Sequence, residues 1–377
     1  MKNRTLAILF LFNTISIFAQ TGNEEKTWID KGKKLHEDQD YRGSLRAYLK
    51  AYKLNAKKEE TVYQIAWTYN ELKVYDSALI YVNKGLLLDS KDERLYNESG
   101  YAYRQKGFYK KAIGEYESAY ALNPDNKTAI KGLGDSYKKN EKYDDALVYY
   151  KKYLLLDEDN ADVYYSMGYI YNENEEYETA EKKLLKSIDL DPNVAETYNE
   201  LGYCYSKQKN NSDAIYYYKK AIDVEPNKST YYFNIGDIYY NSDPKKIDDA
   251  IEWYEKGDEY ENEDATAYYH LGWCYNEKEL YSKAKIALSK CIKIDGSYNE
   301  ALIELGYAYY KLNDNTKAIT TLKNAIAKNS KASLARYYLG LVYVNQGDKT
   351  NANLMYNELL PLDSDNAAKL KKKINAM

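Results

Sequence analysis

Two pairs of adjacent aspartates, Asp144–Asp145 and Asp248–Asp249, are the residues of this chain that most resemble acid–base catalysts. Neighbouring carboxylates can divide the roles of general acid and general base between them. Both pairs stand where the hydrophobic pattern predicts the start of a helix, and carboxylates there favour the positive end of the helix dipole. The sequence also contains no G-x-x-x-x-G-K-[ST] phosphate loop, no H-E-x-x-H and no nucleophile elbow. We therefore expect a protein that is not an enzyme and that uses no cofactor.

Cysteine and histidine offer little material for metal or redox chemistry. The histidines are His36 and His270, too few for a histidine-rich metal site. The cysteines, Cys204, Cys274 and Cys291, have no C-x-x-C spacing and leave one over in any pairing. Because each lies on an apolar helical stripe, we expect buried free thiols, with disulfides as the alternative in an exported protein.

Tyrosine is the residue type that stands out, with 47 in 377 residues. Many tyrosines belong to one phrase, in which a glycine is followed by an aromatic residue and, two places further on, by a tyrosine. The phrase occurs as SGYAY (99–103), MGYIY (167–171), LGYCY (201–205), LGWCY (271–275) and LGYAY (305–309). Rings in such numbers either pack a core or form a recognition surface. The elements that carry the phrase decide between these roles.

The phrase belongs to a repeat of 34 residues. Its glycine, called the repeat glycine below, aligns at Gly32, Ala66, Gly100, Gly134, Gly168, Gly202, Gly236, Gly272, Gly306 and Gly340. Every interval is 34 residues except the one from Gly236 to Gly272, which is 36. A fixed period of this length is typical of a solenoid.

Each repeat predicts two amphipathic helices joined by a short polar turn, because apolar residues recur at three and four places in two runs. Small residues on both helices, such as Gly202 and Ala214, let the two backbones approach closely. Proline ends the second helix in NPD (123–125), DPN (191–193) and EPN (225–227). One pair cannot bury its apolar face alone, so the repeats must stack.

Segment 195–228, AETYNELGYCYSKQKNNSDAIYYYKKAIDVEPNK, resembles the tetratricopeptide repeat family in its Gly, Tyr, Ala and Pro positions. The resemblance implies an all-α fold, a right-handed superhelical solenoid of antiparallel helix pairs with about ten units. The ten copies are identified at 25–58, 59–92, 93–126, 127–160, 161–194, 195–228, 229–264, 265–298, 299–332 and 333–366.

Three copies depart from the family pattern. Leu35 stands where the first copy should have a tyrosine, and Ala66 replaces the glycine of the second. The seventh copy has two extra residues near 241–247, which we expect in the turn between its helices. We expect residues 20–24 to form a short linker and residues 367–377 to form a C-terminal capping helix.

The tyrosine three places after the repeat glycine is predicted to be core, because its uniformity suits a packing position. Nine repeats have it: Tyr69, Tyr103, Tyr137, Tyr171, Tyr205, Tyr239, Tyr275, Tyr309 and Tyr343. Tyrosines 16 places after the repeat glycine are predicted to be core on the second helix, for the same reason: Tyr116, Tyr150 and Tyr218.

The residue directly after the repeat glycine should face water, since Lys33, Asp135 and Asp237 occur there. The residue four places earlier lies about 40° away on the same helix face. In the resembled family this face lines the concave groove that holds partners. The aromatic residues at these two positions form what we call the aromatic stripe: Tyr63, Trp67, Tyr101, Tyr165, Tyr169, Tyr203, Phe233, Tyr269, Trp273, Tyr307 and Tyr337.

The function expected from the resemblance and the stripe is a non-enzymatic protein–protein interaction scaffold, which binds a peptide or partner protein in an aromatic-lined groove. Carbohydrate recognition by the same rings is the alternative, and self-association through the ends of the solenoid is a third reading. An AT-rich codon bias is another origin for the tyrosines, although it does not account for the tryptophans. The family's carboxylate clamp needs asparagine after the repeat glycine; Lys131 is followed instead by Asp135, so the clamp is not expected.

Residues 1–19 are expected to be a signal peptide, with a basic start, an apolar run and a small residue, Ala19, before the cleavage point. We therefore expect an exported protein, periplasmic or extracellular, with a partner in the cell envelope. The apolar run is too short for stable membrane insertion. A net charge of −4, with both signs evenly mixed, argues against nucleic acid as a partner.

Overall fold

The computed structural model of the protein describes residues 22–260 and 263–377. The chain divides into two compact units, called unit 1 (Met1–Leu190) and unit 2 (Asp191–Met377). The expected signal peptide, residues 1–19, lies outside the described residues. The expected linker at 20–24 is corrected in part, because residues 22–24 already belong to a helix that runs through residues 22–37.

Both units are built from helices that alternate between the first and the second helix of each repeat. In unit 1 the helix at 22–37 is followed by α2 (Tyr41–Leu54), α3 (Glu59–Glu71), α4 (Tyr75–Leu88), α5 (Glu93–Gln105), α6 (Tyr109–Leu122), α7 (Lys127–Lys139), α8 (Tyr143–Leu156), α9 (Ala161–Glu173) and α10 (Tyr177–Leu190). Unit 2 contains α11 (Ala195–Lys207), α12 (Asn211–Val224), α13 (Ser229–Tyr240), α14 (Ile247–Asp258), α15 (Ala265–Glu277), α16 (Tyr281–Ile294), α17 (Asn299–Lys311), α18 (Asn315–Lys328), α19 (Ser333–Asn345), α20 (Lys349–Leu359) and α21 (Ser364–Asn375).

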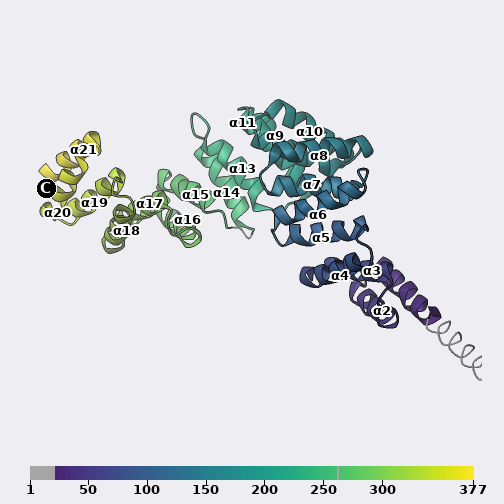
Figure 1. Cartoon of the computed structure of the whole chain (residues 1–377). Coiled ribbons are helices and arrows are strands. Elements are labelled where there is room, and N and C mark those ends of the chain that lie inside the picture. Colours follow the sequence, from purple (N-terminus) through teal and green to yellow (C-terminus); the bar gives the residue numbers. More distant parts are fainter. Residues whose placement is uncertain (1–21, 261–262) are drawn as a thin grey trace, which may run out of the picture. The chain divides into compact units, whose positions relative to one another are not determined.

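Within each unit, from α2 onward, every helix contacts the next one along the chain, and Figure 1 shows successive helices side by side. The described residues contain no strand. The fold is therefore the all-α solenoid of antiparallel helix pairs that the repeat predicts.

The turn inside a helix pair has the same backbone conformation in nine repeats. Its residue seven places after the repeat glycine has a positive φ, close to 60° in Gln39, Lys73, Glu141, Glu175, Lys209, Glu279 and Asn313, and 77° and 74° in Gly107 and Gly347. A left-handed residue at this point ends the first helix. Residues other than glycine adopt it at a cost of about 1 kcal/mol, which the packing of the two helices must offset.

The repeat glycine makes room for a large side chain of the second helix. A Cβ placed on Gly134 would lie 2.6 Å from the ring of Tyr150. Where the second helix supplies leucine instead, the contact is the same, with 2.5 Å from such a Cβ on Gly306 to Leu322. The partners are 16 residues apart in both cases. The prediction that the tyrosines at this second position are core is confirmed, since all three are buried: Tyr116, Tyr150 and Tyr218.

The tyrosine three places after the repeat glycine is less buried than the sequence predicts. Tyr171, Tyr275 and Tyr343 are buried, but the other six are only half-buried. Tyr137 shows why, because one face of its ring lies flat on the ring of Tyr149, with centroids 5.6 Å apart. The position therefore packs the two helices of a pair while leaving the edge of the ring in water.

The two extra residues of the seventh repeat lie in the turn between its helices, as predicted. Helix α13 ends at Tyr240 and α14 begins at Ile247, so residues 241–246 form the turn. In the preceding repeat residues 208–210 are enough. The helices α13 and α14 have 12 residues each, one and two fewer than the 13 and 14 of the preceding pair.

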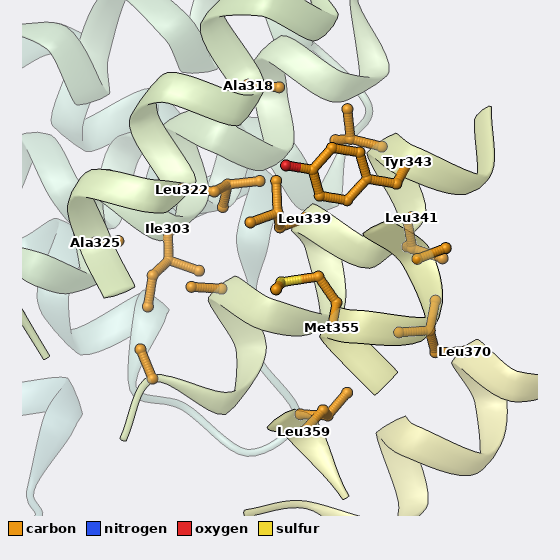
Figure 2. Packing of buried hydrophobic residues seen from close by; sticks show 14 of the residues in the cluster. Ile303, Ala318, Leu322, Ala325, Leu339, Leu341, Tyr343, Met355, Leu359 and Leu370 are labelled. Atoms are coloured by element: carbon orange, nitrogen blue, oxygen red, sulfur yellow. The ribbon is translucent and has the colours of Figure 1, made fainter. Parts of the chain in front are cut away.

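The C-terminal end of unit 2 is closed by one apolar cluster with side chains from α17 to α21, which Figure 2 shows around Leu339 and Met355. Leu370 of α21 covers the repeat glycine of the last repeat, because a Cβ on Gly340 would lie 2.4 Å from it. At Gly340 the side chain of Leu370 thus fills the space that a side chain of the second helix fills in other repeats. Helix α21 begins at Ser364, three residues before the expected capping segment 367–377.

Two further expectations about reactive side chains agree with the structure. All three cysteines are buried thiols that form no disulfide, as predicted. The aspartate pairs lie in the first turns of α8 and α14, where they favour the helix dipole.

Candidate functional site

The aromatic stripe belongs to a layer formed by the first helices. Consecutive first helices contact one another within each unit, through α3, α5, α7 and α9 in unit 1 and through α11, α13, α15, α17 and α19 in unit 2. From Gly32 to Gly306 every repeat glycine faces a large side chain of its own second helix, whereas Gly340 faces Leu370 of α21. The next residue is rotated by about 100° and lies on another face, where neighbouring first helices meet.

Unit 1 contains a cavity of about 280 Å³ in this layer, between α3, α5 and α7. Trp67 and Tyr101 of the aromatic stripe line it together with Glu98 and Arg104. We call it the Trp67 cavity. It stays open on the α7 side because Gly132 has no side chain there.

Two more cavities follow along unit 1. One of about 350 Å³ shares Arg104 and Asp135 with the Trp67 cavity. The next, of about 280 Å³, shares Lys138 with the second and is lined by Tyr165 and Tyr169 of the aromatic stripe. We call the three together the cavity row. It passes from α3 to α9 and lies within unit 1.

Asp135 is the electrostatic centre of the cavity row. It pairs with Arg104 and with Lys131 Nζ, at 3.3 Å from the latter, and accepts a hydrogen bond of 2.8 Å from Tyr150 Oη. Lys131 also pairs with Asp162, at 2.5 Å. Although burial opposes the ionisation of Asp135, the charges of Lys131 and Arg104 hold its pKa below the usual range. Asp135 is therefore a fixed negative charge.

Glu98, a residue of α5, lines the Trp67 cavity on the side of α3, opposite Asp135. It has different partners. The Asn70 amide donates to its carboxylate at 2.7 Å and to its main-chain oxygen at 3.0 Å. Burial raises the pKa of Glu98 to about 7, and the charge of Glu71 adds to the rise. Among the residues that the structure describes, none forms an ion pair with Glu98.

The stripe residues of unit 1 lie in this region but have different surroundings. Trp67 and Tyr101 line the Trp67 cavity, and Tyr165 and Tyr169 line the third cavity. Tyr63 instead stacks along Trp67, at 6.4 Å between centroids, and the guanidinium of Arg94 covers its ring at 4.3 Å. It therefore supports the wall rather than forming it.

One stripe residue of unit 2 is misassigned by the sequence. Phe233 exposes only 3% of its surface and packs between Tyr254 and Tyr268. Gly257 of the second helix opens the slot for it, since a Cβ there would lie 2.3 Å from the ring. Phe233 is core, and the expectation that it meets a partner is corrected. Leu341 likewise is buried at a position expected to face water.

The other stripe residues of unit 2 are half-buried, and four of them pack on rings of their own unit. Trp273 meets Tyr240 edge to face, at 5.3 Å between centroids. Tyr307 stacks on Tyr338 at 4.6 Å. The remaining contacts are those of Tyr269 with Tyr298, Tyr337 with Tyr338, and Tyr203 with the ammonium of Lys207.

Unit 2 also holds a hydrogen-bonded group around Asp237. Its carboxylate accepts from Tyr254 Oη at 2.5 Å and lies 2.8 Å from His270 Nδ1. The arrangement resembles an acid–histidine–hydroxyl set. Burial, together with the charge of Asp237, raises the pKa of Tyr254 far above its usual value, so this hydroxyl keeps its proton and donates a hydrogen bond to Asp237. The group cross-links two repeats.

Sequence reasoning missed the polar half of the site. The sequence places Asp135 in solvent and Lys131 at the position of a clamp residue, whereas both belong to one network with Arg104. Asn70 and Glu98 were not singled out at all. The available signal was the charge at a position that is aromatic in other repeats, and the glycine at 132.

Other kinds of site find no support in the described part of the chain. Residues 22–260 and 263–377 contain no group of three or more His, Cys, Asp or Glu side chains placed to hold a metal ion. Within the same ranges, no helix combines the length and the apolar character needed to cross a membrane.

Comparison with solved structures finds the same fold in many proteins. A tetratricopeptide repeat protein from Parabacteroides merdae is 16% identical and covers 66% of this chain and 97% of its own, with a TM-score of 0.52. The C-terminal part of a repeat-containing protein from Cytophaga hutchinsonii is 22% identical and covers 65% and 98%, with a TM-score of 0.51. YrrB, described as having an unusual peptide-binding site, is 25% identical and covers 48% and 93%, with a TM-score of 0.42.

No curated protein matches the sequence. Family models do match it, and each is described as a tetratricopeptide repeat. They cover residues 93–126, 131–195, 195–228, 265–298 and 303–367. The matched segments lie in both units and follow the helix pairs of the structure. The chain belongs to the tetratricopeptide repeat family.

Proposed function

We propose that this protein is a non-enzymatic scaffold that binds an extended segment of a partner protein along the first helices of unit 1. Tetratricopeptide repeat proteins generally act as protein–protein interaction scaffolds. The observation that carries the proposal is the cavity row. Each of its cavities, at about 280 to 350 Å³, suits one side chain better than a drug-sized ligand. An extended chain places side chains into successive cavities.

The residues of the cavity row offer two kinds of contact, aromatic and polar. Trp67 and Tyr101 offer rigid rings, the side chains most often found at the centre of an interface. Lys138 donates a hydrogen bond of 2.7 Å to Ser166 Oγ, and burial lowers its pKa, so it is a preformed polar contact between the second and third cavities. The mixture of rings and fixed charges favours a peptide of definite sequence.

The test is a display selection of random peptides on the full-length protein, followed by fluorescence anisotropy with one selected peptide. The double variant Trp67→Ala, Tyr101→Ala should bind that peptide at least about tenfold more weakly, because truncated central rings typically cost more than 1 kcal/mol each. The variant Tyr216→Ala, whose ring is exposed on a second helix, is the control and should bind normally.

Failure to select any peptide, or equal binding by the double variant, contradicts the proposal. A glycan array run in parallel addresses the alternative ligand. Binding to glycans that is lost in the double variant, with no peptide selected, replaces the peptide by a carbohydrate.

We also propose that the protein is exported and that its partner is an envelope protein. The support is residues 1–19, whose basic start and apolar run suit a signal peptide. Cell fractionation with N-terminal sequencing tests this, and the expected new N-terminus is Gln20. An intact Met1 in the cytoplasmic fraction contradicts it.

A further inference from the structure

A set of five residues recurs at the same repeat positions in the two units. In unit 1, α3 and α5 carry Trp67, Asn70, Glu71, Glu98 and Tyr101. In unit 2, α15 and α17 carry Trp273, Asn276, Glu277, Glu304 and Tyr307. The spacing from the tryptophan to the second glutamate is 31 residues in both sets. The tryptophan, the asparagine and the first glutamate belong to one repeat, and the second glutamate and the tyrosine belong to the next. We call each set an Asn–Glu site.

The two Asn–Glu sites have the same internal geometry. Asn276 donates to the Glu304 carboxylate at 2.8 Å and to its main-chain oxygen at 3.1 Å. The corresponding distances from Asn70 to Glu98 are 2.7 and 3.0 Å. A tyrosine beside the second helix's start meets the tyrosine of each site edge to face, with Tyr75 at 6.4 Å and Tyr281 at 6.0 Å. The agreement marks a built arrangement and not a chance contact.

Both sites are rich in hydrogen-bond acceptors that lack donors. Asn70 and Asn276 are 1% and 4% exposed, and the side-chain oxygen of each has no hydrogen-bond partner. At the unit 1 site the side-chain oxygen of Asn97, also on the cavity wall, lacks a partner as well. A buried acceptor without a donor typically costs about 1 to 3 kcal/mol. The unpaired lone pairs of these oxygens give this side of the cavity a negative potential, which favours a cationic ligand.

Negative charge accumulates at the same wall. Glu98 and Glu71 both line the Trp67 cavity, and burial together with their mutual repulsion raises the pKa of Glu98. The three cations that line the cavity each pair with an aspartate: Arg104 and Lys131 with Asp135 on the α7 side, and Lys127 with Asp157. A positive group entering beside Glu98 removes the repulsion and replaces the lost solvent.

The aromatic walls suit the same kind of group, because the faces of tryptophan and tyrosine attract cations. The second copy shows such a contact within the chain. There the ammonium of Lys311 lies 5.1 Å from the ring of Tyr281 and 5.9 Å from that of Tyr307. The residue at the corresponding position of unit 1 is the uncharged Gln105, and the guanidinium of Arg104 lies 5.8 Å from the ring of Tyr101 instead.

Only the unit 1 copy is open to a ligand on its third side. There the following first helix has Gly132, which leaves the Trp67 cavity of about 280 Å³. In unit 2 the same position is Tyr338, whose ring stacks on Tyr307 at 4.6 Å. The two copies thus share the acceptors and rings but differ in access.

We infer that the Trp67 cavity binds a lysine or arginine side chain of the partner, with the cationic head between Trp67 and Tyr101 and against Glu98. A cationic head suits the side of the cavity where Glu98 has no ion pair and where the side-chain oxygens of Asn70 and Asn97 have no donor. Glu71, together with Glu98 in its ionised form, opposes an anion, and a neutral apolar side chain leaves the negative potential of this wall without a counter-charge. This inference deepens the proposed function and depends on it.

The five positions occur a third time in the sequence, as Tyr169, Asn172, Glu173, Glu200 and Tyr203. The spacing from the first residue to the second glutamate is again 31. These residues are divided between the two units, so the inference rests on the other two copies.

The experiment uses four blocked, fluorescein-labelled heptapeptides that differ only at the central residue, which is lysine, arginine, norleucine or glutamate. Norleucine has the shape of the lysine stem without the charge. Anisotropy titrations of the full-length protein should show lysine and arginine peptides binding at least about tenfold more tightly than the norleucine peptide, with the glutamate peptide weakest.

Glu98→Gln should remove the preference for lysine over norleucine, while circular dichroism stays unchanged because glutamine can still accept from Asn70. Glu304→Gln is the matched control: it alters the same buried pair at the closed copy and should leave the preference intact. A preference that survives Glu98→Gln, or equal binding of charged and norleucine peptides, overturns the inference and leaves the proposed function standing. Binding of none of the four peptides, together with a failed display selection, overturns both.

Discussion

The two Asn–Glu sites present one polar core in two settings, and the difference between them comes from a pair of residues outside the core. In unit 1 the ring of Tyr116 fills the space next to α7, so Gly132 must be glycine: a Cβ there would lie 2.4 Å from that ring. In unit 2 the residue at the position of Tyr116 is the smaller Leu322, and Tyr338 occupies the place of Gly132. Access to the acceptors is thus set by how the preceding repeat fills its own core.

A second comparison concerns the aspartates that follow the repeat glycine. Asp135 and Asp237 both accept from the large tyrosine of their own second helix, at 2.8 and 2.5 Å. Asp135 is matched by Arg104 and Lys131, whereas Asp237 is matched by the imidazole of His270. The same position therefore supplies a strongly charged wall in unit 1 and a hydrogen-bonded link between repeats in unit 2.

The largest expected effect is a loss of stability when a large side chain is placed at the open side of the unit 1 copy. Gly132→Tyr should destabilise α5 to α7 by about 3 kcal/mol, because overpacking against Tyr116 forces side chains off their rotamers. Amide hydrogen exchange of these helices in the full-length protein measures the loss. Adding Tyr116→Leu reproduces the unit 2 arrangement and should recover most of it. If the double variant is as unstable as the single one, the sizes of these two residues do not explain the difference between the two copies.

The second prediction opens the unit 2 copy. Tyr338→Ala should lower the free energy of unfolding by about 2 kcal/mol, since it removes a ring stacked on Tyr307 and leaves a cavity. Urea unfolding measures the loss, with the exposed Tyr216→Ala expected to change stability by less than about 0.5 kcal/mol. The same variant should gain a second binding site for the lysine heptapeptide. If the variant still binds one peptide per chain, as the wild type should, the two copies differ in more than access.

The third prediction is a pH dependence. The pKa of Glu98 is raised from 4.5 to about 7, so between these values the folded chain keeps a proton that the unfolded chain has lost. Stability from this group is complete below pH 4.5 and falls as the pH rises toward 7. Relative to wild type, Glu98→Gln should therefore gain stability between pH 4 and pH 8, by urea unfolding. Glu158→Gln, at an exposed position, should run parallel to wild type; a parallel course for Glu98→Gln contradicts the raised pKa.

The smallest expected effect concerns the outer faces of the two tryptophans. Trp67 is covered by His36, with centroids 3.8 Å apart, whereas the ammonium of Lys245 lies 5.3 Å from the ring of Trp273 and 3.8 Å from that of Tyr240. Lys245→Met should cost about 0.5 to 1 kcal/mol, the usual value of an exposed cation–π contact. Thermal unfolding measures it, with the exposed Lys323→Met as the reference. Equal shifts in both variants mean that the ring contact contributes nothing.

The sequence predicts the fold well because the period, the repeat glycine and the turn residues are local signals that return in register. It predicts the degree of burial less well. Tyr137 looks like core in one repeat, but whether a neighbour covers its edge depends on the stacking of whole helices. Phe233 became core because of Gly257, a residue on another helix whose only signal is its small size. The Trp67 cavity needs the combination of Tyr116 and Gly132, which no single repeat contains.

The contact between Tyr116 and Gly132 crosses the boundary between two repeats, and so does the pairing of Asn70 with Glu98. If the array grew by copying one 34-residue unit, such partners would be separated. Each would then lie beside a residue that does not match it. Tyr116 copied next to a residue like Tyr338 leaves no room for either ring. The piece of this chain that can be duplicated or moved without damage therefore begins and ends inside a repeat, so that it keeps each large residue with the small one 16 places further on. The Asn–Glu pattern returns every three repeats in the sequence, as expected if such longer pieces were copied together.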